Sequence, residues 1–157
     1  MHSPPVSGVV IAMNEPIGVI GLVCPDAAPL LSFISLAAPA LALGNRVVAV
    51  PSEAHPLIVT DLYQVLDTSD LPGGALNIVT GSAAELGRSL AGHAEVDAIW
   101  SFGGDAAEIE RLSAGTLKRS WVDDGAAIDW LDPLAGEGPE FLRQATQVKN
   151  IWVPYGV

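Results

Sequence analysis

The chain has little positive charge. Seven Lys and Arg residues stand against eighteen Asp and Glu, and the formal net charge is −11. Nucleic-acid-binding domains are basic and cluster their cations, whereas these seven are spread along the whole chain. The negative charge also disfavours anionic lipid surfaces. Nucleic acid is therefore not expected as a partner, and the acidity is interpreted as an aid to solubility.

Cysteine is almost absent as well. The single residue, Cys24, excludes an internal disulfide and any metal site built from several cysteines. The three histidines, His2, His55 and His93, are too far apart to show ligand spacing, so no metal site is expected. Because the sequence places no base beside Cys24 to generate a thiolate, we interpret this residue as a small buried hydrophobe and not as a nucleophile.

The chain also lacks the segments that direct proteins to membranes. No basic and then apolar stretch marks a signal peptide, and residues 1–8 are interpreted as a linker. The longest apolar stretch, residues 29–44, has about 16 residues and contains Pro39, which is too short to span a bilayer comfortably. No membrane partner is expected, and the cytoplasm is the default compartment.

What the chain does have is a regular alternation of apolar runs and helical stretches. Strands are predicted over residues 17–24, 46–50, 76–80, 98–102 and 117–122. Helices are predicted over residues 29–43, 55–66, 82–91 and 106–113, with Ser82 as an N-cap and Glu85 completing a capping box. The helix at 29–43 is apolar nearly all round, so we expect it to be buried on most faces. This alternation predicts an α/β fold, a doubly wound, Rossmann-like parallel sheet with helices on both faces.

The pattern changes after Val122. Residues 123–140 hold six acidic residues and no basic one, which predicts a solvated connection. Residues 141–146 predict one helical turn or two. The final run, residues 148–155, is strand-like and lies outside the alternating unit, so it needs a partner edge. It either folds back on its own sheet or adds to another chain.

Several motifs in order resemble the aldehyde dehydrogenase superfamily. They are EPIGVIG at 15–21, LAAPALALGNRVVAVP at 36–51, LPGGALNIVTG at 71–81, HAEVD at 93–97 and FGG at 102–104. The resemblance is strong over about residues 15–105 and resumes with ATQVKNIWVPYG at 145–156. The region of the superfamily that is most similar is the degenerate C-terminal region of the family-16 enzymes.

The resemblance implies a domain organisation. Residues 1–14 would be a linker and leading strand, 15–122 the NAD(P)-binding domain and 123–140 the acidic connection. Residues 141–157 would carry the oligomerisation strand, which in the family pairs with a neighbouring subunit. The partner would be a second copy, in a homo-oligomer, or a catalytic aldehyde dehydrogenase domain. The family's ELGGK-like base motif and GQxC-like nucleophile motif do not occur, so no catalytic residue is assigned and no independent activity is expected.

The resemblance also implies candidate cofactor-binding residues: Glu53, Ser52, Gly81 and Gly103. The KPxE motif of the family reads VPSE at 50–53, which retains Glu53 as an acceptor for an adenosine ribose. Gly81 and Gly103 belong to two turns that would face the pyrophosphate.

Other positions of the same motifs have diverged. The lysine of KPxE is Val50, the phosphate-facing serine of an FTGST-like turn is Gly104, and PWNxP reads PDAAP at 25–29. In PDAAP the tryptophan is Asp26 and the oxyanion-donating asparagine is Ala27, a loss that typically costs on the order of a hundred- to a thousandfold in rate. These losses argue against NAD(P) binding.

Three functions remain open. The first is a non-catalytic, pseudo-enzyme module that acts in the structure or assembly of an aldehyde dehydrogenase. The second is a component of an NAD(P)-dependent aldehyde dehydrogenase, an oxidoreductase whose catalytic cysteine lies in another domain or subunit. The third is a free dinucleotide-binding module without chemistry. Function has to be argued from the site and not from the fold, so the structure of the site decides among them.

Overall fold

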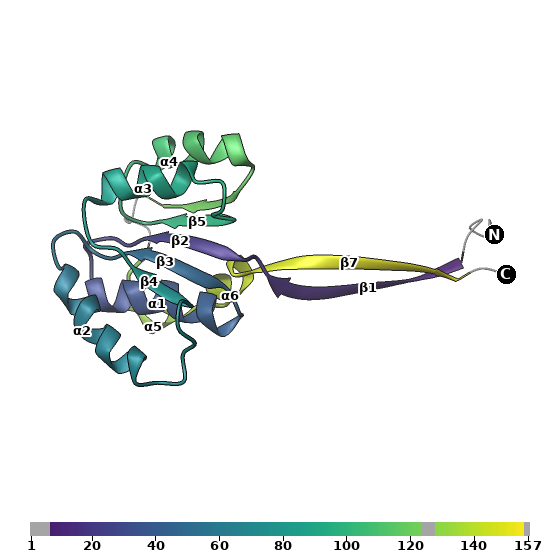
Figure 1. The fold of residues 1–157 in the computed structure, drawn as a ribbon, viewed down its shortest axis with the longest axis horizontal. Helices are drawn as coiled ribbons and strands as arrows, with labels where there is room; N and C mark the ends of the chain where they lie inside the picture. Colours follow the sequence, from purple (N-terminus) through teal and green to yellow (C-terminus); the bar gives the residue numbers. More distant parts are fainter. Residues whose placement is uncertain (1–6, 124–127, 156–157) are drawn as a thin grey trace.

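The computed structural model describes residues 7–123 and 128–155. A five-stranded parallel sheet with helices on both faces forms the body of the molecule, and a two-stranded ribbon extends from it (Figure 1). The predicted doubly wound α/β fold is thereby confirmed.

The sheet has the strand order β4-β3-β2-β5-β6. Its strands are β2 (Val19–Val23), β3 (Arg46–Val50), β4 (Leu76–Ile78), β5 (Ala98–Ser101) and β6 (Arg119–Val122). The connecting helices are α1 (Pro29–Ala42), α2 (Pro56–Asp67), α3 (Ala83–Gly92) and α4 (Ala106–Ser113), followed by the 3₁₀ helix η1 (Ala114–Thr116). The chain winds outward from β2 to β4 and then restarts at β5, so the order reverses between β2 and β5. Ligands of open α/β sheets bind at the carboxyl ends of the strands beside such a reversal.

The core lies on both faces of the sheet. Ile20, Leu22 and Trp100 pack on the face covered by α1 and α2, and Ile99 packs with Ile109 on the face covered by α3 and α4. Burial on both faces is why the strands are continuous apolar runs instead of alternating ones.

Helix α1 departs from the prediction that it is buried on most faces. Phe33, Leu36 and Ala40 are buried, but Leu31 and Ile34 are 44% and 40% exposed. The sheet, α2, α5 and α6 cover part of this helix, and Leu31 and Ile34 lie on the part that remains exposed.

The segment that follows β6 adds an aromatic layer to the core. It contains two short helices, α5 (Pro133–Gly136) and α6 (Pro139–Gln144), and buries Trp130 and Phe141. Trp130 packs edge to face on Phe102 with 5.5 Å between the ring centroids, and Phe141 packs on Trp121 at 5.3 Å. The prediction of a solvated connection missed this burial, because the acidic residues around Trp130 dominate the local composition. Residues 124–127 of the connection lie outside the described residues.

The two ends of the described chain form the ribbon. Strand β1 (Ser7–Pro16) pairs antiparallel with β7 (Thr146–Tyr155) over ten residue pairs, from Ser7 opposite Tyr155 to Pro16 opposite Thr146. The final strand therefore does not fold back on the parallel sheet, as one alternative had it. It pairs instead with β1, most of which falls within the linker and leading strand that the sequence predicted at residues 1–14. The other alternative, addition to another chain, stays a prediction.

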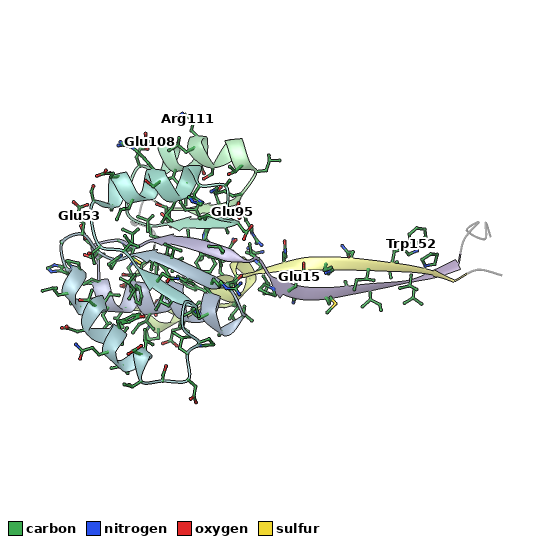
Figure 2. All side chains as sticks on the ribbon, in the orientation of Figure 1. Glu15, Glu53, Glu95, Glu108, Arg111 and Trp152 are labelled. Atoms are coloured by element: carbon green, nitrogen blue, oxygen red, sulfur yellow. The ribbon has the colours of Figure 1, made fainter. Side chains whose placement is uncertain are left out.

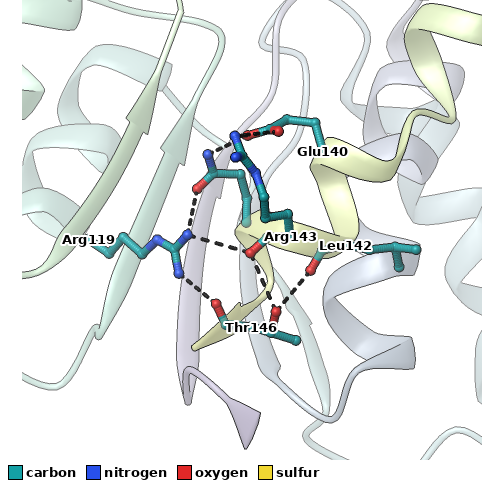
Figure 3. Close-up of polar contacts among 6 residues, drawn as sticks. Arg119, Glu140, Leu142, Arg143 and Thr146 are labelled. Atoms are coloured by element: carbon teal, nitrogen blue, oxygen red, sulfur yellow. Dashed lines mark hydrogen bonds and ion pairs between the residues drawn. The ribbon is translucent and has the colours of Figure 1, made fainter. Parts of the chain in front are cut away.

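Two polar side chains fix the ribbon to the body. The Oδ1 atom of buried Asn45 accepts hydrogen bonds from the amides of Ile17 (2.7 Å) and Gly18 (3.1 Å), just after β1. Its Nδ2 donates at 2.9 Å to the carbonyl of Ala145, just before β7. Arg119 at the start of β6 donates to the Thr146 carbonyl at 2.6 Å (Figure 3). Both ribbon strands thus leave the sheet from fixed points.

No helix in the described part of the chain combines the length and the apolar character needed to cross a membrane.

Candidate functional site

The candidate site is the carboxyl edge of the sheet, where the loops after β2, β3, β4 and β5 meet. The structure brings the sequence-predicted residues Ser52, Glu53, Gly81 and Gly103 to this edge, because each follows a parallel strand. The contacts of each residue decide whether it is free to bind a ligand.

Ser52 is committed to contacts inside the protein. It is fully buried, and its hydroxyl donates to Oδ1 of Asp26 at 2.5 Å while accepting from the amide of His55 at 3.1 Å. The amide of Ala54 donates to the same Asp26 oxygen at 3.2 Å. These donors, with the Ser52 hydroxyl first, lower the pKa of Asp26 below its ordinary value, so the carboxylate stays charged. Asp26 and Ser52 thus clamp the loops after β2 and β3 together.

Glu53 lies at the N-terminus of α3, where its Oε2 accepts a hydrogen bond from the amide of Ala83 at 2.8 Å (Figure 2). Ser82 occupies the predicted N-cap position, but its side chain makes no capping bond. The predicted capping box with Glu85 is therefore wrong. A carboxylate from the loop after β3 satisfies the amide instead, which a local sequence pattern does not reveal.

Helix α4 also has a carboxylate at its N-terminus, but this one comes from the residue directly before the helix. Asp105 is the N-cap of α4, and its Oδ1 accepts from the amide of Glu108 at 3.1 Å. The N-termini of α3 and α4 both point to the carboxyl edge, and each is the place where a dinucleotide fold would present amides to a phosphate. In this chain each end carries a carboxylate.

The glycines of this edge are explained by packing and backbone conformation. A Cβ on Gly103 would collide with the backbone carbonyl of Cys24, so this glycine permits the loops after β2 and β5 to touch. A Cβ on Gly81 would lie 3.0 Å from Cδ1 of Leu86. Gly104 has a φ of +145°, which strains any L side chain and explains why a serine does not stand there.

All seven Lys and Arg residues lie within the described part of the chain, and one of them, Arg88, reaches the carboxyl edge, where its Nε lies 2.7 Å from Oε2 of Glu108 in the first turn of α4. Arg46 and Arg119 begin strands at the opposite edge. Lys118 donates to carbonyls at the C-terminal end of α3, those of Leu90 at 3.0 Å and His93 at 2.6 Å. Arg88 and Arg111 form ion pairs with Glu108 in the first turn of α4, whereas Arg143 pairs with Glu140 and Lys149 with Glu15. The carboxylates of Asp26, Glu53 and Asp105 therefore outnumber the cations near this edge, since Arg88 is already paired with Glu108.

Comparison with known proteins identifies the family. The family model described as "Aldehyde dehydrogenase family" matches residues 3–127. The chain belongs to the aldehyde dehydrogenase family. It is 39% identical over 117 residues to an NADP/NAD-dependent aldehyde dehydrogenase of Escherichia coli, and this match covers 72% of the chain and 23% of the relative. It is 38% identical to a betaine aldehyde dehydrogenase of Bacillus subtilis over 115 residues, 72% of the chain and 24% of the relative.

Solved aldehyde dehydrogenases share the fold. An aldehyde dehydrogenase of Bartonella henselae superposes with a TM-score of 0.67 at 30% identity, over 78% of this chain and 25% of that one. Aldehyde dehydrogenase C of Pseudomonas syringae, solved with NAD+ and octanal, superposes with a TM-score of 0.69 at 34% identity, over 75% of this chain and 25% of that one. The chain spans about a quarter of the length of these relatives.

The family match ends at residue 127, before the segment that buries Trp130 and Phe141. In this aldehyde dehydrogenase family member, the aromatic layer over β5 and β6 is thus built by residues beyond the recognised family region. No sequence motif predicts this layer. The sequence indicates it only by two large aromatic residues, Trp130 and Phe141, in and just after an acidic stretch.

Cys24 is confirmed as a buried thiol. It is 2% exposed, and burial raises its pKa to about 12. A nucleophilic cysteine needs a lowered pKa and access to substrate, and Cys24 has neither. At the neighbouring motif position, Val50 is 1% exposed and packs in the core, so it offers nothing to a ligand. Within the described residues, no three His, Cys, Asp or Glu side chains form a metal-binding group.

Proposed function

We propose that this chain is a non-catalytic, pseudo-enzyme module that acts in the structure or assembly of an aldehyde dehydrogenase. The observation that carries the proposal is the pair of carboxylates, Glu53 and Asp105, hydrogen-bonded at the N-termini of α3 and α4. We further propose that its place within the family is the degenerate C-terminal region of the family-16 enzymes.

Electrostatics at this edge do not fit a dinucleotide. A pyrophosphate bridge carries negative charge and needs helix amides or cations to offset it. Glu53 already accepts the first amide of α3, and Asp105 accepts an amide of α4. A pyrophosphate placed at these helix ends would be repelled by both carboxylates, and this repulsion would be strongest at low salt.

The self-contained core also supports a module that does without a catalytic domain. Trp130 and Phe141 cover the aromatic side chains of β5 and β6, so the chain buries that face of its sheet with its own residues. A fragment that needed a catalytic domain to complete this part of the fold would leave these rings exposed.

The alternative function is a component of an NAD(P)-dependent aldehyde dehydrogenase whose catalytic cysteine lies in another domain or subunit. It is favoured by the family membership and by the retained Glu53. Under either function, the expected partner is a second copy or a catalytic aldehyde dehydrogenase domain, engaged through the C-terminal strand β7.

Calorimetric titration with NAD+ and NADP+ at millimolar concentrations tests the proposal. The chain is expected to show no saturable heat and no oxidation of aldehydes. The double variant Glu53→Gln/Asp105→Asn keeps hydrogen-bond acceptors at both helix ends and removes two charges, so weak binding is expected to appear. The control is Glu95→Gln/Glu110→Gln, which changes the net charge equally at exposed positions away from the carboxyl edge. Saturable one-to-one binding by the unsubstituted chain would overturn the proposal.

A further inference from the structure

A groove of about 340 Å³, here named the α1–α6 groove, lies between α1 and the segment that forms α5 and α6. A Cβ on Gly136 would lie 3.5 Å from Oγ of Ser35, so this glycine lets α5 pack directly against α1. Leu31, Ile34 and Leu142 line the groove and are 44%, 40% and 48% exposed. Apolar side chains from two helices are thus left uncovered at one place in the described chain, which marks an interaction surface.

The lining of the groove has helical spacing. Leu31, Ile34 and Ala38 follow one another at intervals of three and four residues, which places them on one stripe of α1. At 1.5 Å per residue this stripe is about 10 Å long, or two turns. The ridge of a helix packs into a groove of this kind, with the few large side chains that a helix presents at i, i+3 and i+7. All lining residues belong to α1 or to residues 136–142, so no described strand edge is there to pair with an extended peptide.

The wall that α5 and α6 form is acidic. Residues 128–142 include four Asp and Glu residues and no Lys or Arg. Glu137 lines the groove, and Asp132 lies at the N-terminus of α5, where its Oδ1 accepts from the amide of Leu134 at 3.0 Å. Helix α1 contributes no charged side chain. Anionic lipid and a second copy of this chain, with its net charge of −11, are therefore disfavoured, and a basic partner is favoured.

Pro39 adds a hydrogen-bond acceptor for such a partner. A proline inside a helix has no N–H for the carbonyl four residues earlier, which here is the carbonyl of Ser35. Both residues line the groove. This carbonyl therefore retains acceptor capacity that a lysine or arginine side chain of the partner can use.

We propose that the α1–α6 groove binds an amphipathic helix of a partner protein, with an apolar face against Leu31, Ile34 and Leu142 and basic residues beside Glu137. This goes beyond the proposed function, which assigns only β7 as a contact surface. A contact of two helical turns is small beside the roughly 1,200–2,000 Å² that stable complexes bury. We therefore expect a dissociation constant in the micromolar range.

Fluorescence anisotropy with synthetic peptides tests the chemistry of the partner. The probe is a labelled helix of leucine and lysine, about 18 residues long, with its leucines on one face. At physiological salt it is expected to bind at least about tenfold more tightly than a scrambled peptide of the same composition, because only the probe presents an apolar face. A peptide with glutamate in place of lysine is expected not to bind. Equal binding of the ordered and the scrambled peptide would reduce the contact to net charge and overturn the inference.

Matched variants test the place of binding. Ile34→Gln removes an apolar contact without a change of charge and is expected to weaken binding at least about fivefold. Its control, Leu57→Gln, makes a similar change at a 72% exposed position on α2 outside the groove and is expected to change the dissociation constant less than about twofold. Glu137→Gln is expected to weaken binding about threefold, and Glu110→Gln on α4 is not. Unchanged circular dichroism spectra exclude unfolding in these variants.

A solvent-sensitive dye gives a second reading of the same site. On Ala38→Cys its emission is expected to shift to the blue when the leucine–lysine peptide is added, and on Leu57→Cys it is not. The native Cys24 is buried and does not take the dye. Full-strength binding by Ile34→Gln, or a silent dye at position 38, would show that the peptide binds elsewhere and would refute the inference. Self-association of the chain that Ile34→Gln abolishes would mean that a second copy covers the groove, which would refute it equally. None of these results bears on NAD(P) binding, which calorimetry tests separately.

Discussion

Trp130→Ala tests whether the segment after β6 completes the core. The Trp130 side chain is 5% exposed and packs on Phe102 and Phe141. A tryptophan buries about 200 Å², which at about 25 cal/mol per Å² amounts to roughly 5 kcal/mol. Truncation of buried aromatic residues to alanine costs about 3–5 kcal/mol. Since folded domains are stable by about 5–15 kcal/mol, we expect Trp130→Ala to remove at least about a fifth of the free energy of unfolding.

Urea unfolding followed by circular dichroism at the helix band measures this effect without relying on tryptophan fluorescence. The expected result is a lower midpoint with an unchanged dependence on urea. Leu134→Ala is the matched control, because Leu134 lies in the same segment but is 88% exposed, and its change should stay within about 0.5 kcal/mol. If the two variants lose equal stability, Trp130 does not close the core, and the argument for a self-contained domain fails.

Three further predictions concern single side chains. Cys24, with its pKa raised from 9.0 to about 12, should hold about a thousandfold less thiolate than an ordinary cysteine, so thiol reagents should label it only at the rate of unfolding. The pKa of Asp26 is lower in the folded protein than its ordinary value of 3.8. The charged carboxylate therefore stabilises the fold at pH values above 3.8, and this stabilisation is lost as the pH falls through the pKa that Asp26 has in the folded protein. Asp26→Asn should therefore flatten the acid side of a thermal-melting profile against pH, and an unchanged profile would contradict the Ser52 clamp. Asn45→Asp removes the donor to the Ala145 carbonyl and buries a charge, so unfolding titrations should show a loss of about 2–4 kcal/mol; a loss below 1 kcal/mol would mean that Asn45 does not hold the ribbon base.

The parallel sheet was predictable because its signal is local and repeated. Each strand is a short apolar run that the chain has to bury on both faces, and each run is followed by a helix of matching period. Residues 46–50 and 106–113 therefore have the same bounds in the sequence prediction and in the structure. The family motifs added the expected positions of Ser52, Glu53, Gly81 and Gly103 at one edge.

The roles of these residues were not predictable in the same way, because they depend on long-range contacts. Glu53 was expected to meet a ribose, but it binds the amide of Ala83, thirty residues away. Ser52 binds Asp26, twenty-six residues away, in place of a ligand. No local sequence pattern distinguishes a carboxylate that is free to bind a ligand from one that is hydrogen-bonded to a helix N-terminus.

By itself, the sequence determined the fold class, the family and the lack of a reactive cysteine, since apolar periodicity, ordered motifs and residue counts carry these properties. The tertiary structure decided what lies at the carboxyl edge and what the chain ends do. Hydrogen bonds across the sheet commit Asp26, Ser52 and Glu53, and the pairing of β1 with β7 joins strands at opposite ends of the sequence. The physical reason is that an amide, a carboxylate or a strand edge takes the partner that folding brings within reach, and sequence separation does not fix that partner.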